Sequence, residues 1–271
     1  MNFIQQVIDS SRLLNVLYDN LDKEITGNPN YQKLCDYLSN YLEFNKLSIE
    51  EAVEIYTRFI SSYNKDCRQF IKTNKYPYEL NPELATLSRE EYDIILLFSV
   101  LFSTHRFRIM ELIQEKKGSG KALYIGLGPG LELLYTQADF TEKIAYDLAV
   151  NPFLNKQFPE VKLNHELYSG QNPDYFDSIY MIELLEHVPD PFQLLKIAYA
   201  SLKTGGKVLF TTASNIPQFD HVFNFSPDHT EFESKLQEMG FNILFKEKIQ
   251  HNYITVDLNS SNHFYVIEKT K

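Results

Sequence analysis

Two glutamates and a histidine lie close together in the segment Glu183-Leu-Leu-Glu186-His187. If one helical turn follows the apolar run before them, the three side chains share a face, because residues three and four positions apart are neighbours on a helix. Two carboxylates and an imidazole can bind a divalent cation, and this oxygen-rich set favours Mg²⁺ or Mn²⁺, with Zn²⁺ as an alternative. Two other interpretations stay open: His187 is a general base without a metal, or the Glu-His pair only caps the next helix.

A second group of residues has the types and spacing that suit a ligand with a ribose. The glycines Gly126, Gly128 and Gly130 follow a short apolar run; a helical pattern and a second apolar run come next, and that run ends in Asp147. Glycines at such a turn let the backbone approach a ligand closely, and the helix that follows offers free N–H groups. An acid at the tip of the second strand can accept both hydroxyls of a ribose. This order predicts a nucleotide-like ligand.

A sheet is needed to position these residues, and the chain after the segment Lys116-Lys-Gly-Ser-Gly120 has the pattern of one. Short apolar runs alternate with helical stretches, which is typical of an α/β fold with a mostly parallel sheet covered on both faces. The last two strands follow each other directly, which predicts one antiparallel edge strand. We expect strands near 121–126, 143–147, 160–164, 176–182, 206–213, 241–249 and 262–268. We expect helices near 130–137, 150–156, 190–203 and 229–239.

The first part of the chain, residues 1–117, has helical spacing of its apolar residues and no strand-like alternation. Ser48 with Glu51, and Ser88 with Glu91, have the form of capping boxes that open helices. The expected helices cover 3–18, 31–44, 48–71 and 89–116. We therefore expect two domains, an all-helical domain over 1–117 and a sheet domain over 118–271.

Composition narrows the class of protein. The 271 residues are 44% hydrophobic, enough for a large core, and carry a formal net charge of −10, which argues against a broad nucleic-acid surface. The two cysteines, Cys35 and Cys67, are too few for a disulfide framework or a Cys-based zinc site. The N-terminus lacks the build of a signal peptide, and no run approaches the ~18 apolar residues of a membrane span. We expect a soluble, cytoplasmic protein.

Four segments of the second part resemble class I S-adenosylmethionine-dependent methyltransferases: 124–130, 145–149, 176–191 and 202–210. Within that superfamily, the third segment is most similar to the ubiquinone-biosynthesis O-methyltransferases. The resemblance covers about residues 117–271, and we recognise no family in residues 1–116. It implies a Rossmann-like sheet, S-adenosylmethionine as cofactor and methyl transfer as the activity. It does not identify the acceptor.

The resemblance also implies roles for single residues. The three glycines lie beside the methionine end of the cofactor, and Asp147 binds the ribose hydroxyls unless it is only the N-cap of a helix. Glu166, in the same way, is either a cofactor contact or a solvated loop acid. The other implied contacts are Leu148 at the adenine, Glu166 and Leu167 at the adenine amino group, and Met181 and Ile182 along the cofactor.

One position departs from the family pattern. An acid usually stands two residues before the first glycine and fixes the glycine loop and the methionine end, whereas this chain has Tyr124. That role can pass to Glu132, to a residue of the helical domain or to the Tyr124 hydroxyl. Arg106 can pair with the methionine carboxylate; the alternative is that it belongs to a basic last turn of the helix over 89–116.

The metal hypothesis gains a fourth residue from the resemblance. A similar Glu-x-x-Glu-His, with a later histidine, binds a metal in the small-RNA 2′-O-methyltransferases. His221 follows the fifth expected strand and can be that histidine, beside Glu183, Glu186 and His187. The metal would hold two vicinal oxygens of an acceptor and lower a hydroxyl pKa. Without a metal, His221 is a second candidate general base.

We expect methyl transfer to a small-molecule acceptor, at oxygen, with the helical domain as lid, acceptor wall or homodimer interface. Three alternatives stay open. An RNA or protein methyltransferase fits the Glu-x-x-Glu-His motif but not the acidic charge. A non-catalytic cofactor-binding protein is suggested by Tyr124. An aminopropyl transferase shares the fold, but the sequence has no convincing set of acids for a polyamine.

Overall fold

The computed structural model describes residues 2–80, 87–136, 140–251 and 258–270. Within these ranges seven strands form one sheet in the order β3-β2-β1-β4-β5-β7-β6. Strands β1 to β5 are parallel, and β7 is antiparallel to both of its neighbours. The predicted Rossmann-like sheet and its reversal are confirmed, with the reversed strand one place in from the edge. The strands are β1 (Gly120–Ile125), β2 (Phe140–Tyr146), β3 (Val161–Asn164), β4 (Phe176–Met181), β5 (Leu202–Ser214), β6 (Phe241–Gln250) and β7 (Ser261–Lys269).

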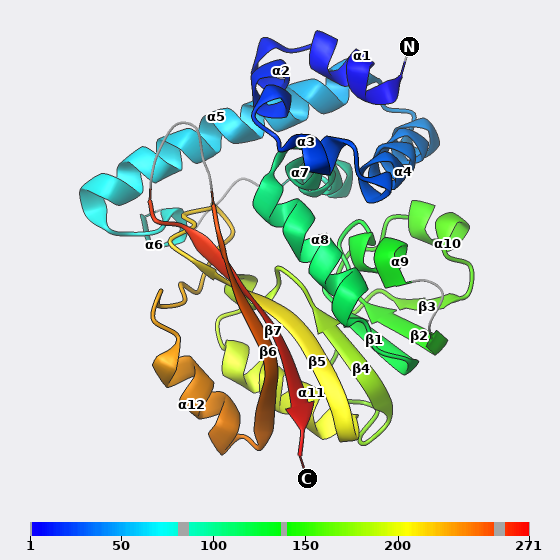
Figure 1. Ribbon diagram of the computed structural model, residues 1–271, viewed down its shortest axis with the longest axis vertical. Coiled ribbons are helices and arrows are strands. Elements are labelled where there is room, and N and C mark those ends of the chain that lie inside the picture. The colour runs from blue at the N-terminus through cyan, green and yellow to red at the C-terminus, as the bar shows by residue number, and fades with distance from the viewer. Residues whose placement is uncertain (1, 81–86, 137–139, 252–257, 271) are drawn as a thin grey trace.

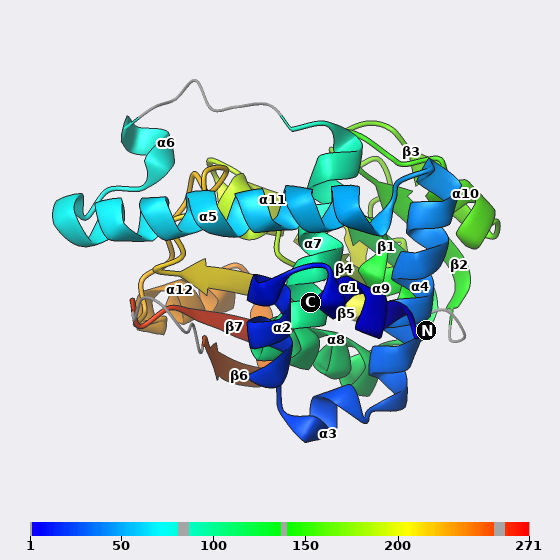
Figure 2. The same cartoon turned by 90° about the horizontal axis from the view of Figure 1, so that it is seen from above.

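Most of the helices before the sheet gather at one end of the molecule, above the strands, and the last of them runs down beside the sheet (Figure 1). They are α1 (Phe3–Asp9), α2 (Arg12–Asp19), α3 (Lys23–Thr26), α4 (Pro29–Asn45), α5 (Ile49–Thr73), α6 (Pro77–Leu80), α7 (Arg89–Phe102) and α8 (Thr104–Lys116). The long α5 crosses this helical part (Figure 2). Later come α9 (Leu131–Thr136), α10 (Phe153–Gln157), α11 (Pro191–Ser201), α12 (Thr230–Glu238) and the 3₁₀ turn η1 (Leu185–His187). Gln137, the last residue of one predicted helix, lies outside the described residues.

Both predicted capping boxes are present. The hydroxyls of Ser48 and Ser88 accept from the N–H groups of Glu51 and Glu91, and each glutamate accepts from the N–H of its serine in return. These paired hydrogen bonds fix where α5 and α7 begin. None of the helices in the described part of the chain is long and apolar enough to span a bilayer.

The single helix expected over 89–116 is instead two helices. Ser103 separates them with an extended backbone, φ −138° and ψ 127°. Its hydroxyl donates to the carbonyl of Ser99, the kind of local bond by which serine competes with a continuing helix. As a result, Arg106 lies in the first turn of α8, and the interpretation of it as part of a basic last turn is wrong.

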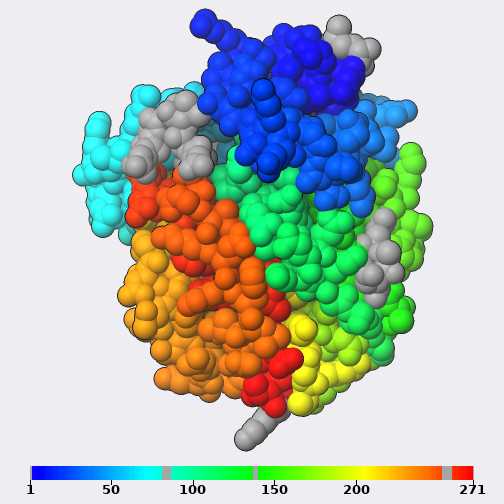
Figure 3. All heavy atoms as spheres, viewed as in Figure 1, coloured from blue at the N-terminus to red at the C-terminus, as the bar shows by residue number. Residues whose placement is uncertain are grey.

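The two faces of the sheet follow from the alternation of side chains along each strand. One face carries Tyr124 and Ile182 and packs against α4, α8, α9 and α10, in a cluster of buried apolar residues that continues into α1, α2, α5 and α7. The other face carries Ile125 and Met181 and packs against α11 and α12. One core therefore joins the helical part to the sheet, and Figure 3 shows the blue N-terminal helices seated directly on the rest of the molecule.

The glycine turn after β1 depends on its glycines. Gly126, Gly128 and Gly130 all have positive φ, at 70°, 55° and 81°. A Cβ on Gly130 would lie 2.7 Å from Leu154 Cδ2, so the close approach of α10 also needs a glycine there. Gly130 thus allows α10 to pack closely against the glycine turn.

We predict that Gly130→Ala loses more stability than Gly205→Ala, although both glycines have positive φ. A Cβ on Gly205 would meet no atom within 4 Å in the described part of the chain, so alanine there costs only the left-handed backbone, about 1–2 kcal/mol. Alanine at 130 adds overpacking against Leu154, about 1–3 kcal/mol more. Urea unfolding of the two variants measures the difference; equal midpoints would contradict the packing role of Gly130.

Candidate active site

A cavity of about 580 Å³ opens where β1, β2 and β4 end. In a parallel sheet these carboxyl ends meet at one edge, and the strand order changes direction between β1 and β4, which is where α/β proteins bind ligands. Helices α7 and α8 form the opposite wall through Leu96, Val100 and Met110. The predicted site residues that line it are Gly126, Gly128, Asp147, Leu148, Glu166, Leu167, Ile182, Arg106, Glu183 and His187.

Asp147 points at the glycine turn. Its Oδ2 accepts from the Gly128 N–H at 2.9 Å, and its Oδ1 accepts from the Ala149 N–H at 3.0 Å. The next helix, α10, begins only at Phe153 with Pro152 as its N-cap, so Asp147 is not a helix cap. The carboxylate therefore joins the end of β2 to the turn after β1, inside the cavity.

Arg89, in the first turn of α7, contacts the same carboxylate and was missed by the sequence analysis. Its Nη1 lies 3.1 Å from Asp147 Oδ1, and its Nη2 lies 2.7 Å from Asp93 Oδ1. Tyr41 of α4 donates to the other oxygen of Asp93 at 2.9 Å. Burial is the largest effect on Asp93 and raises its pKa, although Arg89 and Tyr41 oppose that shift. The pair of Arg89 and Asp93 can be predicted from sequence, because the two residues are four positions apart on a helix. The contact between Arg89 and Asp147 cannot be predicted in this way.

Three predicted cofactor contacts do not line the cavity. Met181 points to the opposite face of the sheet, and Gly130 lies behind the turn. Tyr124 is fully buried, stacks on Tyr180 at 4.9 Å and shares a hydrogen bond with Thr136. Its hydroxyl is thus used within the core and not at the ligand. Glu132 of α9, the alternative named for this role, does line the cavity.

The mouth of the cavity is apolar and open. Leu148 and Leu167 are 71% and 70% exposed, an unusual state for large apolar side chains, and Glu166 lies beside them. A flat ring bound at the mouth would cover both leucines.

The expected four-residue metal set is only partly brought together. Ligand atoms of Glu186, His187 and His221 all lie within 4.8 Å of one another. The Glu183 side chain is not part of this cluster. Its carboxylate lies 3.3 Å from Arg106 Nη2 and accepts a hydrogen bond from the Asn262 side chain at 2.7 Å. The reason is local, because η1 begins at Leu185 and Glu183 precedes that turn with φ 50°.

Glu186 and His221 are buried polar groups that lack hydrogen bonds. Both carboxylate oxygens of Glu186 and both ring nitrogens of His221 have no hydrogen-bond partner among the described residues. Burial, followed by the nearby Glu183 charge, raises the pKa of Glu186 to about 8. Burial, followed by His187, lowers the pKa of His221 to about 3. Buried polar atoms are normally bonded, so this pair points to a ligand.

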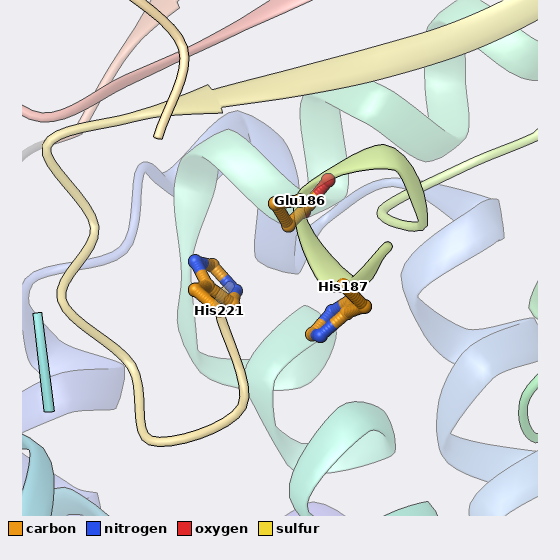
Figure 4. A group of neighbouring side chains, drawn as sticks. All are labelled: Glu186, His187 and His221. Carbon is orange, nitrogen blue, oxygen red and sulfur yellow. The ribbon is translucent and has the colours of Figure 1, made fainter. Parts of the chain in front are cut away.

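His187 connects Glu186 and His221 to the cavity. It belongs to the same cluster, and it is the one member of that cluster that also lines the cavity. Its Nδ1 lies 3.1 Å from the Asp220 carbonyl oxygen and 3.4 Å from the Asp220 carboxylate. Burial lowers the pKa of His187, but Asp220 and Glu186 outweigh burial and leave it raised. Figure 4 shows Glu186 and His187 on the turn after β4 and His221 on the loop after β5.

Comparison with known proteins identifies the family of the chain. Residues 104–244 match a family model described as a methyltransferase domain. The ubiquinone biosynthesis O-methyltransferase of Pseudomonas putida (strain W619) is 37% identical over 57 residues, 21% of this chain and 25% of that protein. The enzyme of the same name from Aliivibrio fischeri is 24% identical over 151 residues, 49% of this chain and 64% of that protein. The chain thus spans less than two thirds of these relatives.

A solved structure shares the fold. It is the 1,6-didemethyltoxoflavin-N1-methyltransferase of Burkholderia thailandensis, with bound 1,6-didemethyltoxoflavin and S-adenosylhomocysteine. The TM-score is 0.50 at 16% sequence identity, over 70% of this chain and 93% of that one. At this identity the likeness concerns the fold alone.

We predict that Arg89→Met destabilises the protein by about 3–5 kcal/mol at pH 7, because it leaves the buried Asp93 carboxylate without its cation. The loss shrinks as the pH falls toward 4, since the folded state then takes up a proton on Asp93 more readily than the unfolded chain. Arg58→Met, in the exposed pair with Glu91, is the matched control and costs about 0–1 kcal/mol. Urea unfolding at several pH values measures both; equal losses would refute the buried-pair account.

Proposed function

This chain belongs to the family of methyltransferase domains, and we propose that it transfers a methyl group from S-adenosylmethionine to an oxygen of a small-molecule acceptor. The observation that carries the proposal is the Asp147 carboxylate, held against the Gly128 N–H inside a cavity at the ends of β1 and β2. We further propose that a divalent cation assists, and that the acceptor carries two neighbouring oxygens.

The residues present fit an adenosine-bearing cofactor. Asp147 can accept from ribose hydroxyls, and the backbone at Gly126 and Gly128 is bare enough for close approach. The exposed Leu148 and Leu167 provide apolar surface for the adenine. When bound, the cofactor supplies a methyl group on a sulfonium, which a nucleophile can displace without covalent help from the protein. The protein then contributes mainly by holding the two reactants in line.

The residues present also fit a metal ion. Glu186 and His221 offer buried atoms without hydrogen-bond partners in the described ranges, and His187 completes a mixed oxygen and nitrogen set. An ion bound there would lower the pKa of an acceptor hydroxyl. His187 lines the cavity, with Asp220 fixing its ring through Nδ1, so it marks where an acceptor would meet the cluster.

A small molecule suits this cavity better than RNA or protein. Its volume of about 580 Å³ lies in the range of small-ligand sites, and α7 and α8 cover one side with apolar residues. The net charge of −10 disfavours a polyanion. The Burkholderia thailandensis structure of the same fold holds a small molecule, and we propose the same class of acceptor for this chain.

We predict that S-adenosylhomocysteine binds in isothermal titration calorimetry, and that labelled methyl transfer to a vicinal diphenol such as 3,4-dihydroxybenzoate is stopped by EDTA. Glu186→Gln should lower the rate by about 100-fold or more while leaving cofactor affinity unchanged, because Glu186 does not line the cavity. Glu238→Gln, at the exposed end of α12, is the control.

Each result bears on one part of the proposal. If S-adenosylhomocysteine does not bind, the proposed methyltransferase activity is refuted. Cofactor binding with transfer that EDTA leaves unchanged, but that His187→Gln abolishes, would replace the metal by His187 as a general base. Metal analysis of the wild-type and Glu186→Gln proteins by mass spectrometry separates these cases.

A further inference from the structure

Glu132 is an acid of the cavity wall with an unused oxygen. It is the second residue of α9, directly after the glycine turn, and its relative exposure is 7%. Its Oε2 is buried and has no hydrogen-bond partner in the ranges that the structure describes. The residues around it in α9, Leu131, Leu133 and Leu134, are all buried and apolar. A carboxylate kept in such a place costs free energy unless something pairs with it.

The other acids near it are already compensated. Asp147 receives hydrogen bonds from two backbone N–H groups and an ion pair from Arg89. Glu183 faces Arg106 and accepts from Asn262. Both arginines that line the cavity are thus engaged with other acids. Glu132 shows no such ion pair among the described residues, and the candidate metal cluster does not include it.

We propose that Glu132 binds the α-ammonium group of the methionine end of the cofactor, an inference that rests on the proposed function. An ammonium group is positively charged and donates hydrogen bonds, so it can pair with the unpartnered Glu132 oxygen. A sulfonium is also positively charged but has no N–H or O–H to donate. The proposed function already assigns the ribose hydroxyls to Asp147, whose carboxylate is held at the Gly128 N–H. Arg106, on the facing wall, provides a cation for the carboxylate of the same amino-acid end.

Tyr124 explains why the acid is needed at position 132. The side chain before the glycine turn is committed to the core through Tyr180 and Thr136 and does not line the cavity. Thr136 also donates to the Glu132 carbonyl at 2.7 Å, so the same helix holds Tyr124 in the core and presents Glu132 to the ligand. The anionic group has moved from the strand to the first turn of the helix.

The binding of an ammonium here has a measurable consequence. Burial raises the pKa of Glu132 to about 8, and the charges of Asp147 and Glu183 add to that shift. Tyr37 of α4 also interacts electrostatically with Glu132, and its own pKa is raised well above its usual range, chiefly by burial. At pH 7 most free molecules therefore carry a proton on Glu132, and pairing with an ammonium would expel that proton.

The test compares two ligands in calorimetry, S-adenosylhomocysteine and 5′-methylthioadenosine, which lacks the amino-acid end. Glu132→Gln should weaken S-adenosylhomocysteine binding by about tenfold or more and leave 5′-methylthioadenosine binding within about twofold. Titrations in buffers of different ionisation enthalpy should give net proton release on S-adenosylhomocysteine binding at pH 7 for the wild type and for Glu238→Gln, and almost none for Glu132→Gln. Wild-type affinity for S-adenosylhomocysteine should rise with pH between pH 6 and 7.

The outcomes separate this inference from the proposed function. If the wild type binds neither ligand, the proposed function fails and this inference with it. If the wild type binds S-adenosylhomocysteine without proton release, or Glu132→Gln weakens both ligands equally, only the role of Glu132 is overturned. The melting temperature of the free Glu132→Gln protein should not fall, because glutamine replaces a buried carboxyl group of the same shape whose Oε2 has no hydrogen-bond partner among the described residues; a fall would identify Glu132 as a structural residue.

Discussion

The carboxylate of Asp147 holds the ligand end of the molecule together. It accepts from the turn after β1 and contacts Arg89 of α7, so one side chain ties a strand end, a glycine turn and the helical part to each other. Arg89 reaches it only because Asp93 and Tyr41 anchor the other end of the guanidinium in the core. The geometry of the cavity therefore depends on a buried ionic chain that begins in α4, within the helical part.

The acidic residues in and near the cavity fall into two groups, those paired with an arginine and those with a buried oxygen that lacks a hydrogen-bond partner among the described residues. Asp147 and Glu183 each form an ion pair with an arginine that lines the cavity. Glu132 and the pair Glu186 with His221 lack hydrogen-bond partners at buried atoms in the described part of the chain. Glu132 borders the glycine turn, whereas Glu186 and His221 lie beside His187. Under the two proposals above, an organic cation and a metal ion would bind at separate places.

Much of this could be predicted from the sequence, for reasons that particular residues make clear. Glycine spacing, strand alternation and the capping boxes at Ser48 and Ser88 are local signals, and the strands and the position of Asp147 followed from them. The break at Ser103 was missed because a serine inside an apolar helical pattern gives no periodic signal. Arg89 and the turning of Glu183 toward Arg106 depend on contacts between segments distant in sequence, which spacing alone cannot reveal.

The core shared by the N-terminal helices and the sheet has an evolutionary consequence. Its apolar cluster runs from Ile4 in α1 to Val266 in β7 without a division at the glycine-rich segment near residue 118. A chimera that grafts another protein's acceptor-binding helices onto this sheet would have to replace that shared interior as well. Substrate range in such a chain is therefore expected to diverge by single substitutions on α7 and α8 and not by exchange of whole modules.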